Sequence, residues 1–402
     1  MQSDIFNKSK NWTALFLTFY AIMTSMALNH GDTTLGSPGI HFVFTLSKNI
    51  TALLAVIFFV LNLRNGHDSK WLNIFLPFFI FAVLHFNIDA LLSILAVLVF
   101  SLVSKKDKSI CYDLFRYYMI ITGALGVVAM SSFLFGLPIP HSSVPYYTQY
   151  EAGNYYFYID YGFSYLCGSN TGLRLCGLFN EPGYYGTIAA FYLISDNFNL
   201  KSKGNIIILL SGMLTLSVAF MVLCFLFFLF KLYYIRSSFK TISYVIIFIG
   251  LLVILGLISS DTISSVMDRF YFEDGKFKGD NRSNDSLDFI FNKLIAGNEY
   301  TLLGYGSLDN LDIGHVAGIK KFIVQYGVVG GFLTLGLLVS SFRYLKLSML
   351  KFCFIFLFFV SIYQRSSIFN LCYLMALFGG LCHIGQTDDD GFHKKLFSKG
   401  YK

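Results

Sequence analysis

The stretch Arg174-Leu-Cys-Gly-Leu-Phe-Asn-Glu-Pro-Gly183 is a charged, turn-forming segment in a sequence that otherwise consists of long apolar runs. Over the whole chain of 402 residues, 55% are hydrophobic, only 13% are charged, and the mean hydropathy is +0.62. Soluble proteins do not have this composition. A bilayer core of about 30 Å needs roughly 20 apolar residues per helix, and apolar runs of that order recur along the chain. The sequence therefore predicts an all-α integral membrane protein.

The apolar runs on either side of this segment define the expected helices. Each run must be helical because lipid cannot satisfy free backbone groups, and the alternation of barrel strands is absent. The expected helices lie near residues 12–28, 41–63, 71–86, 89–104, 117–136, 183–199, 242–258, 318–341, 347–363 and 367–384. The run 204–235 is either one overlong tilted helix or two short helices that turn around residues 214 to 217.

The positive charges decide between these alternatives, because short loops rich in Lys and Arg remain in the cytoplasm. The basic clusters share one side of the membrane only if 204–235 crosses twice. These clusters are Lys8/Lys10, Arg64/Lys70, Lys105/Lys106/Lys108, Lys201/Lys203, Lys231/Arg236/Lys240 and Arg343/Lys346. We therefore expect about twelve membrane-spanning helices, both termini in the cytoplasm and a first helix that is not cleaved as a signal peptide. The net charge of +7 reflects this topology and does not indicate nucleic acid as a partner.

Two long hydrophilic segments, about 137–182 and 259–317, emerge on the outer face in this topology. No internal repeat or low-complexity linker divides the chain, and neither segment is long enough for a separate soluble domain. Residues 1–402 are thus expected to form a single polytopic membrane domain with two large outer (periplasmic) loops. The chemistry of the protein is expected to take place outside the cytoplasm.

The first outer loop contains two cysteines, Cys167 and Cys176, and many tyrosines. An oxidising compartment would permit a disulfide between the cysteines, but a separation of nine residues does not define the geometry. The tyrosines could stack on sugar rings, or they could form an interfacial belt that anchors the loop to lipid headgroups. They are Tyr146, Tyr147, Tyr150, Tyr155, Tyr156, Tyr158, Tyr161 and Tyr165.

Arg174 and Glu181 are the first candidate site residues, because Pro182 and Gly183 follow them where a helix re-enters the membrane. Proline is favourable in the first turn of a helix, and the free amides behind it can bind an anion. An arginine beside such a site would bind a phosphate through two hydrogen bonds. The alternative is an Arg174–Glu181 ion pair that only folds the loop.

Further candidates follow in the second outer loop and beyond it. Arg269 and Arg282 place positive charge on the outer face, where either anionic lipid or a diphosphate would explain it. Tyr305 lies between Gly304 and Gly306, in a tight turn that would let the backbone approach a ligand. His315 is either a base or a structural residue. Arg365, at an outer turn between the last two helices, is a further candidate for the same anion site.

No cofactor is expected from the motifs. The sequence contains no HExxH segment, no Cys/His cluster, no P-loop and no dinucleotide fingerprint. An enzyme of this sequence would need neither a metal nor ATP nor a nicotinamide.

Taken in order, the motifs of the chain resemble those of the Wzy-type O-antigen or capsular polysaccharide polymerases. The resemblance covers roughly residues 170–370 and is carried by the order and the outer placement of short motifs. These are Arg174-x-x-Gly177-x-x-x-Glu181-Pro182-x-x-x-Gly186, Leu214-Thr215-Leu216-Ser217, the Arg269 and Arg282 loop, Gly304-Tyr305-Gly306, and Gln325-Tyr326-Gly327-Val328-Val329-Gly330.

This resemblance implies a metal-independent, membrane-embedded glycosyltransferase in the bacterial inner membrane. Its substrate would be undecaprenyl-diphosphate-linked oligosaccharide at the periplasmic face, with a chain-length regulator and a flippase as partners besides membrane lipid. Cations would neutralise the diphosphate leaving group, a role for Arg174, Arg282, and also Arg269 and Arg365. Glu181 and His315 would be the alternatives for the base.

Two other functions remain as alternatives. The related O-antigen ligases often show a His-Asn pair before their Gly-x-x-Gly helix, but Val316 follows His315 here, which weakens both the ligase reading and the case for His315 as base. A flippase for lipid-linked oligosaccharide would place its charges inside the helices, whereas this chain carries its arginines in the outer loops.

Overall fold

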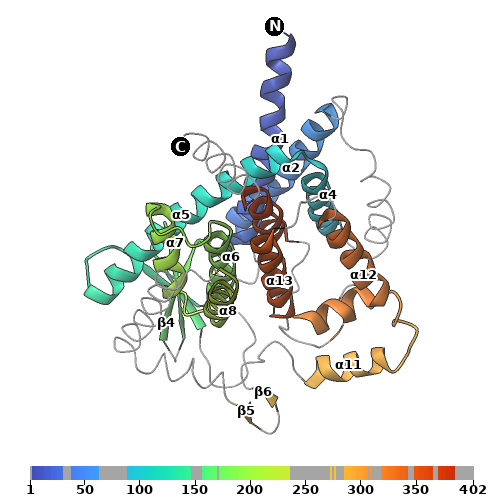
Figure 1. The fold of residues 1–402 in the computed structure, drawn as a ribbon. Coiled ribbons are helices and arrows are strands. Elements are labelled where there is room, and N and C mark those ends of the chain that lie inside the picture. Colours follow the sequence, from blue (N-terminus) through green and yellow to red (C-terminus); the bar gives the residue numbers. More distant parts are fainter. Residues whose placement is uncertain are drawn as a thin grey trace, which may run out of the picture.

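The computed structural model describes most of the chain and is mostly helical (Figure 1). The described residues are 2–29, 38–62, 88–145, 156–169, 172–235, 272–273, 276–277, 285–306, 308, 311, 318–342, 348–364 and 370–384. The helices predicted at 71–86 and 242–258 lie outside this set.

The N-terminal third is a group of long helices. Helix α1 (Gln2–Ser25) packs along α2 (Pro38–Asn62) and α5 (Lys105–Phe135), and α2 also contacts α4 (Ile88–Leu102). The short 3-10 turn η1 (Ala27–Asn29) follows α1. Helix α1 begins ten residues before the expected position, so the polar N-terminal segment continues the first apolar helix.

Helix α5 begins twelve residues before the predicted start at residue 117 because its polar first turn is capped. The side chain of Ser104 accepts a hydrogen bond from the Asp107 amide at 3.2 Å, and its hydroxyl donates to the Asp107 carboxylate at 2.6 Å. Ser104 thus caps the helix through its side chain, and Asp107 places a negative charge in the first turn, where the helix dipole favours it. The helix ends at Gly136, whose left-handed conformation (φ 64°) permits the chain to turn.

A four-stranded antiparallel sheet occupies the segment predicted as the first outer loop, where we expected no strands. Its order is β1 (Ser142–Pro145), β2 (Tyr156–Asp160), β3 (Tyr165–Ser169) and β4 (Gly172–Gly177). Because side chains alternate along a strand, the sheet has two apolar faces. One face, with Leu166 and Leu175, joins the main core, and the other, with Tyr158, Tyr165 and Cys176, packs around Ala27 of η1.

The sheet leads into α6 (Pro182–Ser195), whose residues are all buried. Helix α6 contacts α7 (Lys203–Leu214), α8 (Val218–Ile235) and α13 (Met349–Gln364), and α6, α8 and α13 lie near the centre of Figure 1. The break between α7 and α8 confirms that the run 204–235 forms two helices that turn close to residues 214 to 217.

The C-terminal part contains a further helix pair and the last helix of the described residues. Helix α11 (Asp285–Ile295), preceded by the short strands β5 (Phe272–Glu273) and β6 (Lys276–Phe277), packs against α12 (Ile319–Phe342). Helix α12 is interrupted at Gly327 (φ 63°, ψ −172°). The last helix, Leu371–Ile384, starts as α14 (Leu371–Leu374) and contains one π-helical turn, η3 (Met375–Gly379).

Two of the described helices are long and apolar enough to cross a membrane, Gly39–Leu61 and Lys105–Phe135. Six shorter apolar helices of 10–17 residues are also described: Trp12–Ser25, Leu92–Leu102, Lys203–Leu214, Val218–Tyr233, Met349–Ile362 and Leu371–Ile384. The membrane character of the chain thus appears in its helices, and the number of about twelve spans stays a prediction.

Candidate functional site

Arg174 lies on β4 and points its guanidinium at the break between α7 and α8. Its Nε donates to the carbonyl oxygen of Thr215 at 2.9 Å, and an Nη donates to that of Leu216 at 3.4 Å. Carbonyl groups at a helix C-terminus lack partners within the helix, and a cation satisfies both their hydrogen bonds and the helix dipole. Leu216 has a positive φ of 49°, so the chain turns sharply at the point that Arg174 binds.

The two glycines of the same motif permit close packing around Arg174. A Cβ on Gly186 would lie 2.8 Å from both Ser217 Cβ and Thr215 Oγ1, so α6 crosses directly beside the turn after α7. A Cβ on Gly177 would lie 2.7 Å from the Thr122 side chain of α5, and Gly177 also has a φ of 64°. The motif spacing therefore has a packing explanation: β4 is held against α5, and α6 against the α7–α8 turn.

Glu181 occupies the N-cap position of α6, directly before Pro182 at the first helical position. Its carbonyl oxygen accepts hydrogen bonds from the amides of Tyr184 (3.1 Å) and Tyr185 (3.3 Å), while its carboxylate does not cap the helix. The preceding residue, Asn180, is anchored from two sides. Its amide donates to Ser25 O at 3.3 Å, and its carbonyl accepts from the Tyr158 hydroxyl.

The charges of Arg174 and Glu181 both act on the thiol of Cys167. A hydrogen bond with Cys176 is the main cause that lowers the pKa of Cys167, burial opposes it, Arg174 lowers it further and Glu181 raises it. Arg174 and Glu181, which lie seven residues apart in the sequence, thus both lie close enough to Cys167 to influence its ionisation.

Three tyrosines of the first outer loop, Tyr158, Tyr161 and Tyr165, do not form a surface for sugars or headgroups. Tyr158, Tyr161 and Tyr165 are 1%, 7% and 7% exposed, respectively. Both the stacking surface and the interfacial belt require accessible rings, so both predictions are wrong for these three residues. Burial also raises the pKa of Tyr165 to about 12, which keeps its hydroxyl neutral.

Tyr305 and its flanking glycines contact the backbone of α12. The amides of Tyr305 and Gly306 donate to the carbonyl oxygens of Val324 and Gln325, each at 2.9 Å. A Cβ on Gly304 would lie 2.3 Å from Gln325 O and 2.5 Å from Gly327 N. We expected this turn to approach a ligand closely. Instead, it approaches the backbone of the motif Gln325-Tyr326-Gly327 in α12.

The Tyr305 ring itself is held by its own loop. It stacks on Tyr300 with ring centroids 4.2 Å apart, and its hydroxyl accepts from Asn298 Nδ2 at 3.3 Å. One cation of the second outer loop region is also accounted for, because Lys320 Nζ lies 2.6 Å from Asp288 Oδ1 and joins α12 to α11. The remaining predicted site residues, Arg269, Arg282, His315 and Arg365, lie outside the described residues.

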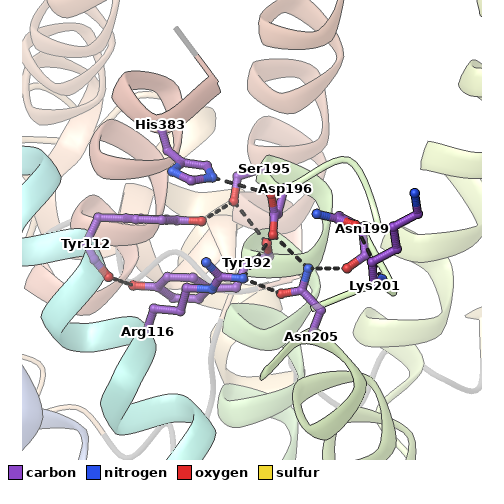
Figure 2. A network of polar contacts seen from close by, with 9 residues as sticks. All are labelled: Tyr112, Arg116, Tyr192, Ser195, Asp196, Asn199, Lys201, Asn205 and His383. Atoms are coloured by element: carbon purple, nitrogen blue, oxygen red, sulfur yellow. Dashed lines mark hydrogen bonds and ion pairs between the residues drawn. The ribbon is translucent and has the colours of Figure 1, made fainter. Parts of the chain in front are cut away.

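A second polar cluster, which we did not predict, lies at the other end of α6 (Figure 2). Asp196 Oδ2 accepts from an Nη of Arg116 at 2.9 Å and from Asn205 Nδ2 at 2.8 Å, and the same Nη donates to Asn205 Oδ1 at 2.6 Å. His383 Nε2 lies 3.5 Å from Asp196 Oδ1. Figure 2 labels these residues with their neighbours Tyr112, Tyr192, Ser195, Asn199 and Lys201.

This cluster joins four separate segments of the chain: α5, the end of α6, α7 and the last helix. The His383 ring also stacks on Tyr112, with centroids 5.2 Å apart, and the Tyr112 hydroxyl hydrogen-bonds Ser195. The available signal was the position of Arg116, Asp196 and His383 at helix ends that the topology places on one side. A hydropathy pattern marks such residues as the ends of apolar helices but does not show which of these ends contact one another.

Among the residues that the structure describes, no group of three or more His, Cys, Asp or Glu side chains could hold a metal ion. The comparisons with known proteins give no family for the chain, because no protein-family model, no curated protein and no solved structure matches it.

Proposed function

We propose that the protein is a membrane-embedded, metal-independent glycosyltransferase that joins undecaprenyl-diphosphate-linked oligosaccharide repeat units at the periplasmic face of the bacterial inner membrane. The observation that carries the proposal is the contact between Arg174 and the turn after α7, at 2.9 Å from Nε to Thr215 O. The two segments are about 40 residues apart in sequence, and both belong to the motifs that resemble the polysaccharide polymerases. Their convergence at the N-terminus of α6 supports one common site.

The chemistry of the leaving group fits Arg174. A diphosphate leaves with negative charge that must be neutralised, and a guanidinium provides five N–H donors in a planar fork. The described contacts of Arg174 are to Thr215 and Leu216, which use two of its nitrogen atoms and hold the plane in place. The remaining donors, together with the positive end of α6, would stabilise the charge that develops as the bond to the diphosphate breaks.

The attacking group would be a sugar hydroxyl at the non-reducing end of a new repeat unit. Its oxygen forms the bond to the anomeric carbon, the bond from that carbon to the diphosphate breaks, and the hydroxyl proton passes to a base. Glu181, whose carboxylate does not cap α6, is one alternative for this base, and His315 is the other. A chain-length regulator and a flippase are the partners that this function implies.

In the proposed orientation, Arg174 and Glu181 lie at one end of α6, and the cluster of Arg116 and Asp196 lies at the other end. Helix α6 has 14 residues and is thus about 21 Å long. Arg174 and Glu181 lie at the end that the topology places outside. Asp196 and Arg116 lie at the end that it places in the cytoplasm, beside the basic segment that contains Lys201.

The role of Arg174 is tested with three variants, Arg174→Lys, Arg174→Gln and Arg174→Ala, in a host strain that lacks the native gene. The measurement is the length of the surface-glycan ladder on a gel, relative to the amount of protein in the membrane. Arg174→Gln keeps a donor for the Thr215 carbonyl but removes the charge, whereas Arg174→Lys keeps the charge. We expect loss of the ladder by about 10²-fold or more in Arg174→Gln and Arg174→Ala and partial activity in Arg174→Lys. Equal, nearly native ladders in Arg174→Lys and Arg174→Gln would assign Arg174 to capping alone.

The class of reaction is tested by deleting the gene and restoring it. If the protein is a polymerase, the deletion strain should carry only a single repeat unit attached to its acceptor. Restoring the gene should restore the ladder. Loss of all attached glycan with accumulation of lipid-linked polymer would identify a ligase instead. Accumulation of unpolymerised lipid-linked repeat at the cytoplasmic face would identify a flippase. For the Arg174 variants of the first test, the control is Lys293→Ala, which removes an exposed positive charge of the second hydrophilic segment and should leave the ladder unchanged.

A further inference from the structure

Two cysteine thiols face each other on the sheet beside Arg174. Cys167 is paired with Arg174 across β3 and β4, and Cys176 lies two residues beyond Arg174, where the register shifts between Leu166–Leu175 and Tyr165–Gly177. In the antiparallel pattern Cys167 and Cys176 are diagonal neighbours on one face of the sheet. Both thiols are unoxidised, both contact the same small apolar cluster around Tyr158 and Tyr165, and they share a hydrogen bond.

The two thiols differ in exposure and in acidity. Cys167 is partly exposed, and the hydrogen bond with Cys176 and the charge of Arg174 hold its pKa below the usual value. Cys176 is fully buried, and burial holds its pKa well above the usual value. A thiolate is the nucleophile in disulfide chemistry, and reactive cysteines are found beside cations with partial exposure. Cys167 has these properties, and Cys176 has the properties of its resolving partner.

We propose that Cys167 and Cys176 form a reversible disulfide, in which the Cys167 thiolate attacks an external disulfide and Cys176 completes the bond. In the first step Cys167 sulfur bonds to one sulfur of a small-molecule or protein disulfide, and the other sulfur of that oxidant leaves as a thiolate. In the second step Cys176 loses its proton and attacks Cys167 sulfur, which releases the second thiolate. The two thiolates take up the two protons, so the external disulfide is reduced to two thiols.

The bond would fasten β3 to β4 at the position of Arg174. Because Arg174 binds the turn after α7, the disulfide would restrict the strand that carries its guanidinium. Oxidation of the thiols is independent of the proposed glycosyltransferase activity. It needs only a disulfide oxidant, which an oxidising compartment outside the cytoplasm supplies.

The test uses the full-length protein, purified in detergent with its thiols reduced and then treated with oxidised glutathione at neutral pH. After quenching with acid and alkylation of free thiols, trypsin cleaves behind Arg174 and places Cys167 and Cys176 on different peptides. We expect these peptides to be joined in a species two hydrogen atoms lighter than their sum. Both cysteines recovered singly as alkylated thiols, with the protein still folded, would overturn the proposal.

Variants assign the two roles. Cys176→Ser should stop the reaction at a glutathione adduct on Cys167, whereas Cys167→Ser should leave Cys176 a free thiol for far longer. Arg174→Gln should move the pH profile of Cys167 alkylation to higher pH, because the neighbouring positive charge is lost. Cys353→Ser, a buried cysteine on α13, should still form the crosslink. An adduct that accumulates on Cys176 in Cys167→Ser as fast as on Cys167 in Cys176→Ser would contradict the assignment.

Discussion

At the scale of the residue, the contacts of Arg174 explain why β4 carries a charged side chain among apolar residues. Its Nε satisfies a carbonyl group at the end of α7, where the α7–α8 turn leaves it without a helical partner. Hydrogen bonds to charged groups contribute about 1.5–3 kcal/mol to stability. Arg174 therefore stabilises the turn, and in the proposed function its remaining N–H groups would also bind an anion.

A Glu181 variant can test the proposed chemistry without disturbing the fold. Its carbonyl begins α6, and any residue retains that carbonyl, so Glu181→Gln should leave the helix intact. If the carboxylate accepts the proton, Glu181→Gln should reduce glycan polymerisation by about 10²–10⁴-fold. The measurement is the surface-glycan ladder relative to membrane protein. Glu299→Gln, an exposed acid in the second hydrophilic segment, is the matched control and should behave as the native protein. An active Glu181→Gln would leave His315 as the base.

Asp196 is the second residue with a clear prediction, which concerns stability. It pairs with Arg116, and both side chains are less than one fifth exposed (15% and 19%). Removing one partner leaves a charge without compensation, so Asp196→Asn should lower the free energy of unfolding by about 1–3 kcal/mol. The double variant Asp196→Asn/Arg116→Met should lose less than the sum of the single variants, because the pair is one interaction.

The thermal midpoint in detergent, compared at one protein concentration, reports these changes. The exposed neighbour Lys201→Gln should stay within about 0.5 kcal/mol of the native protein. Additive losses in the double variant would mean that Arg116 and Asp196 act through other partners.

At the scale of the element, the contact between the Gly304 turn and the break in α12 holds two segments by their backbones. The amides of Val328 and Val329 donate to the carbonyl oxygens of Thr301 and Leu302, at 3.1 and 3.0 Å. A Cβ on Gly327 would lie 2.4 Å from Leu302 O, and one on Gly304 would lie equally close to α12. Because backbone atoms cannot rotate out of the way, both positions require glycine.

Gly304→Ala should therefore lower stability by more than the strain of a positive φ alone. Gly297 also has a positive φ (95°), but a Cβ there would have open space around it, so Gly297→Ala measures that strain by itself. Gly304→Ala should lose an additional 1–3 kcal/mol, roughly the cost of overpacking. Equal shifts of Tm in the two variants would show that the turn and α12 separate without cost.

At the scale of the whole molecule, the prediction is the orientation in the membrane. An alkaline-phosphatase fusion after Asp280 should be active, because only phosphatase that has been exported folds with its disulfides, and a fusion after Lys240 should be inactive. A fusion after Pro145, in β1 of the sheet, should also be active if the sheet lies outside. The opposite activities would place Arg174 and Glu181 in the cytoplasm and remove the periplasmic reaction.

The sequence by itself determined the features that depend on local composition. Apolar runs of sufficient length predicted α2, α6, α12 and α13 to within a few residues, since burial of an apolar helix needs no specific partner. The turn between α7 and α8 was also predictable. Basic residues flank the run 204–235 at both ends, and they lie on the same side of the membrane only if the chain reverses within the run. The early start of α5 was missed because a cap of polar residues outweighs hydropathy at a helix end.

Only the tertiary structure decided what the polar and glycine motifs contact. The sheet of the first hydrophilic segment was not visible as a pattern, because its two apolar faces remove the alternation that marks a strand. Arg174 and Thr215, Gly304 and Gly327, and Arg116 and Asp196 are pairs separated by 23 to 80 residues. Such contacts arise from packing between elements, so residue type and spacing indicate that a position is special without naming its partner.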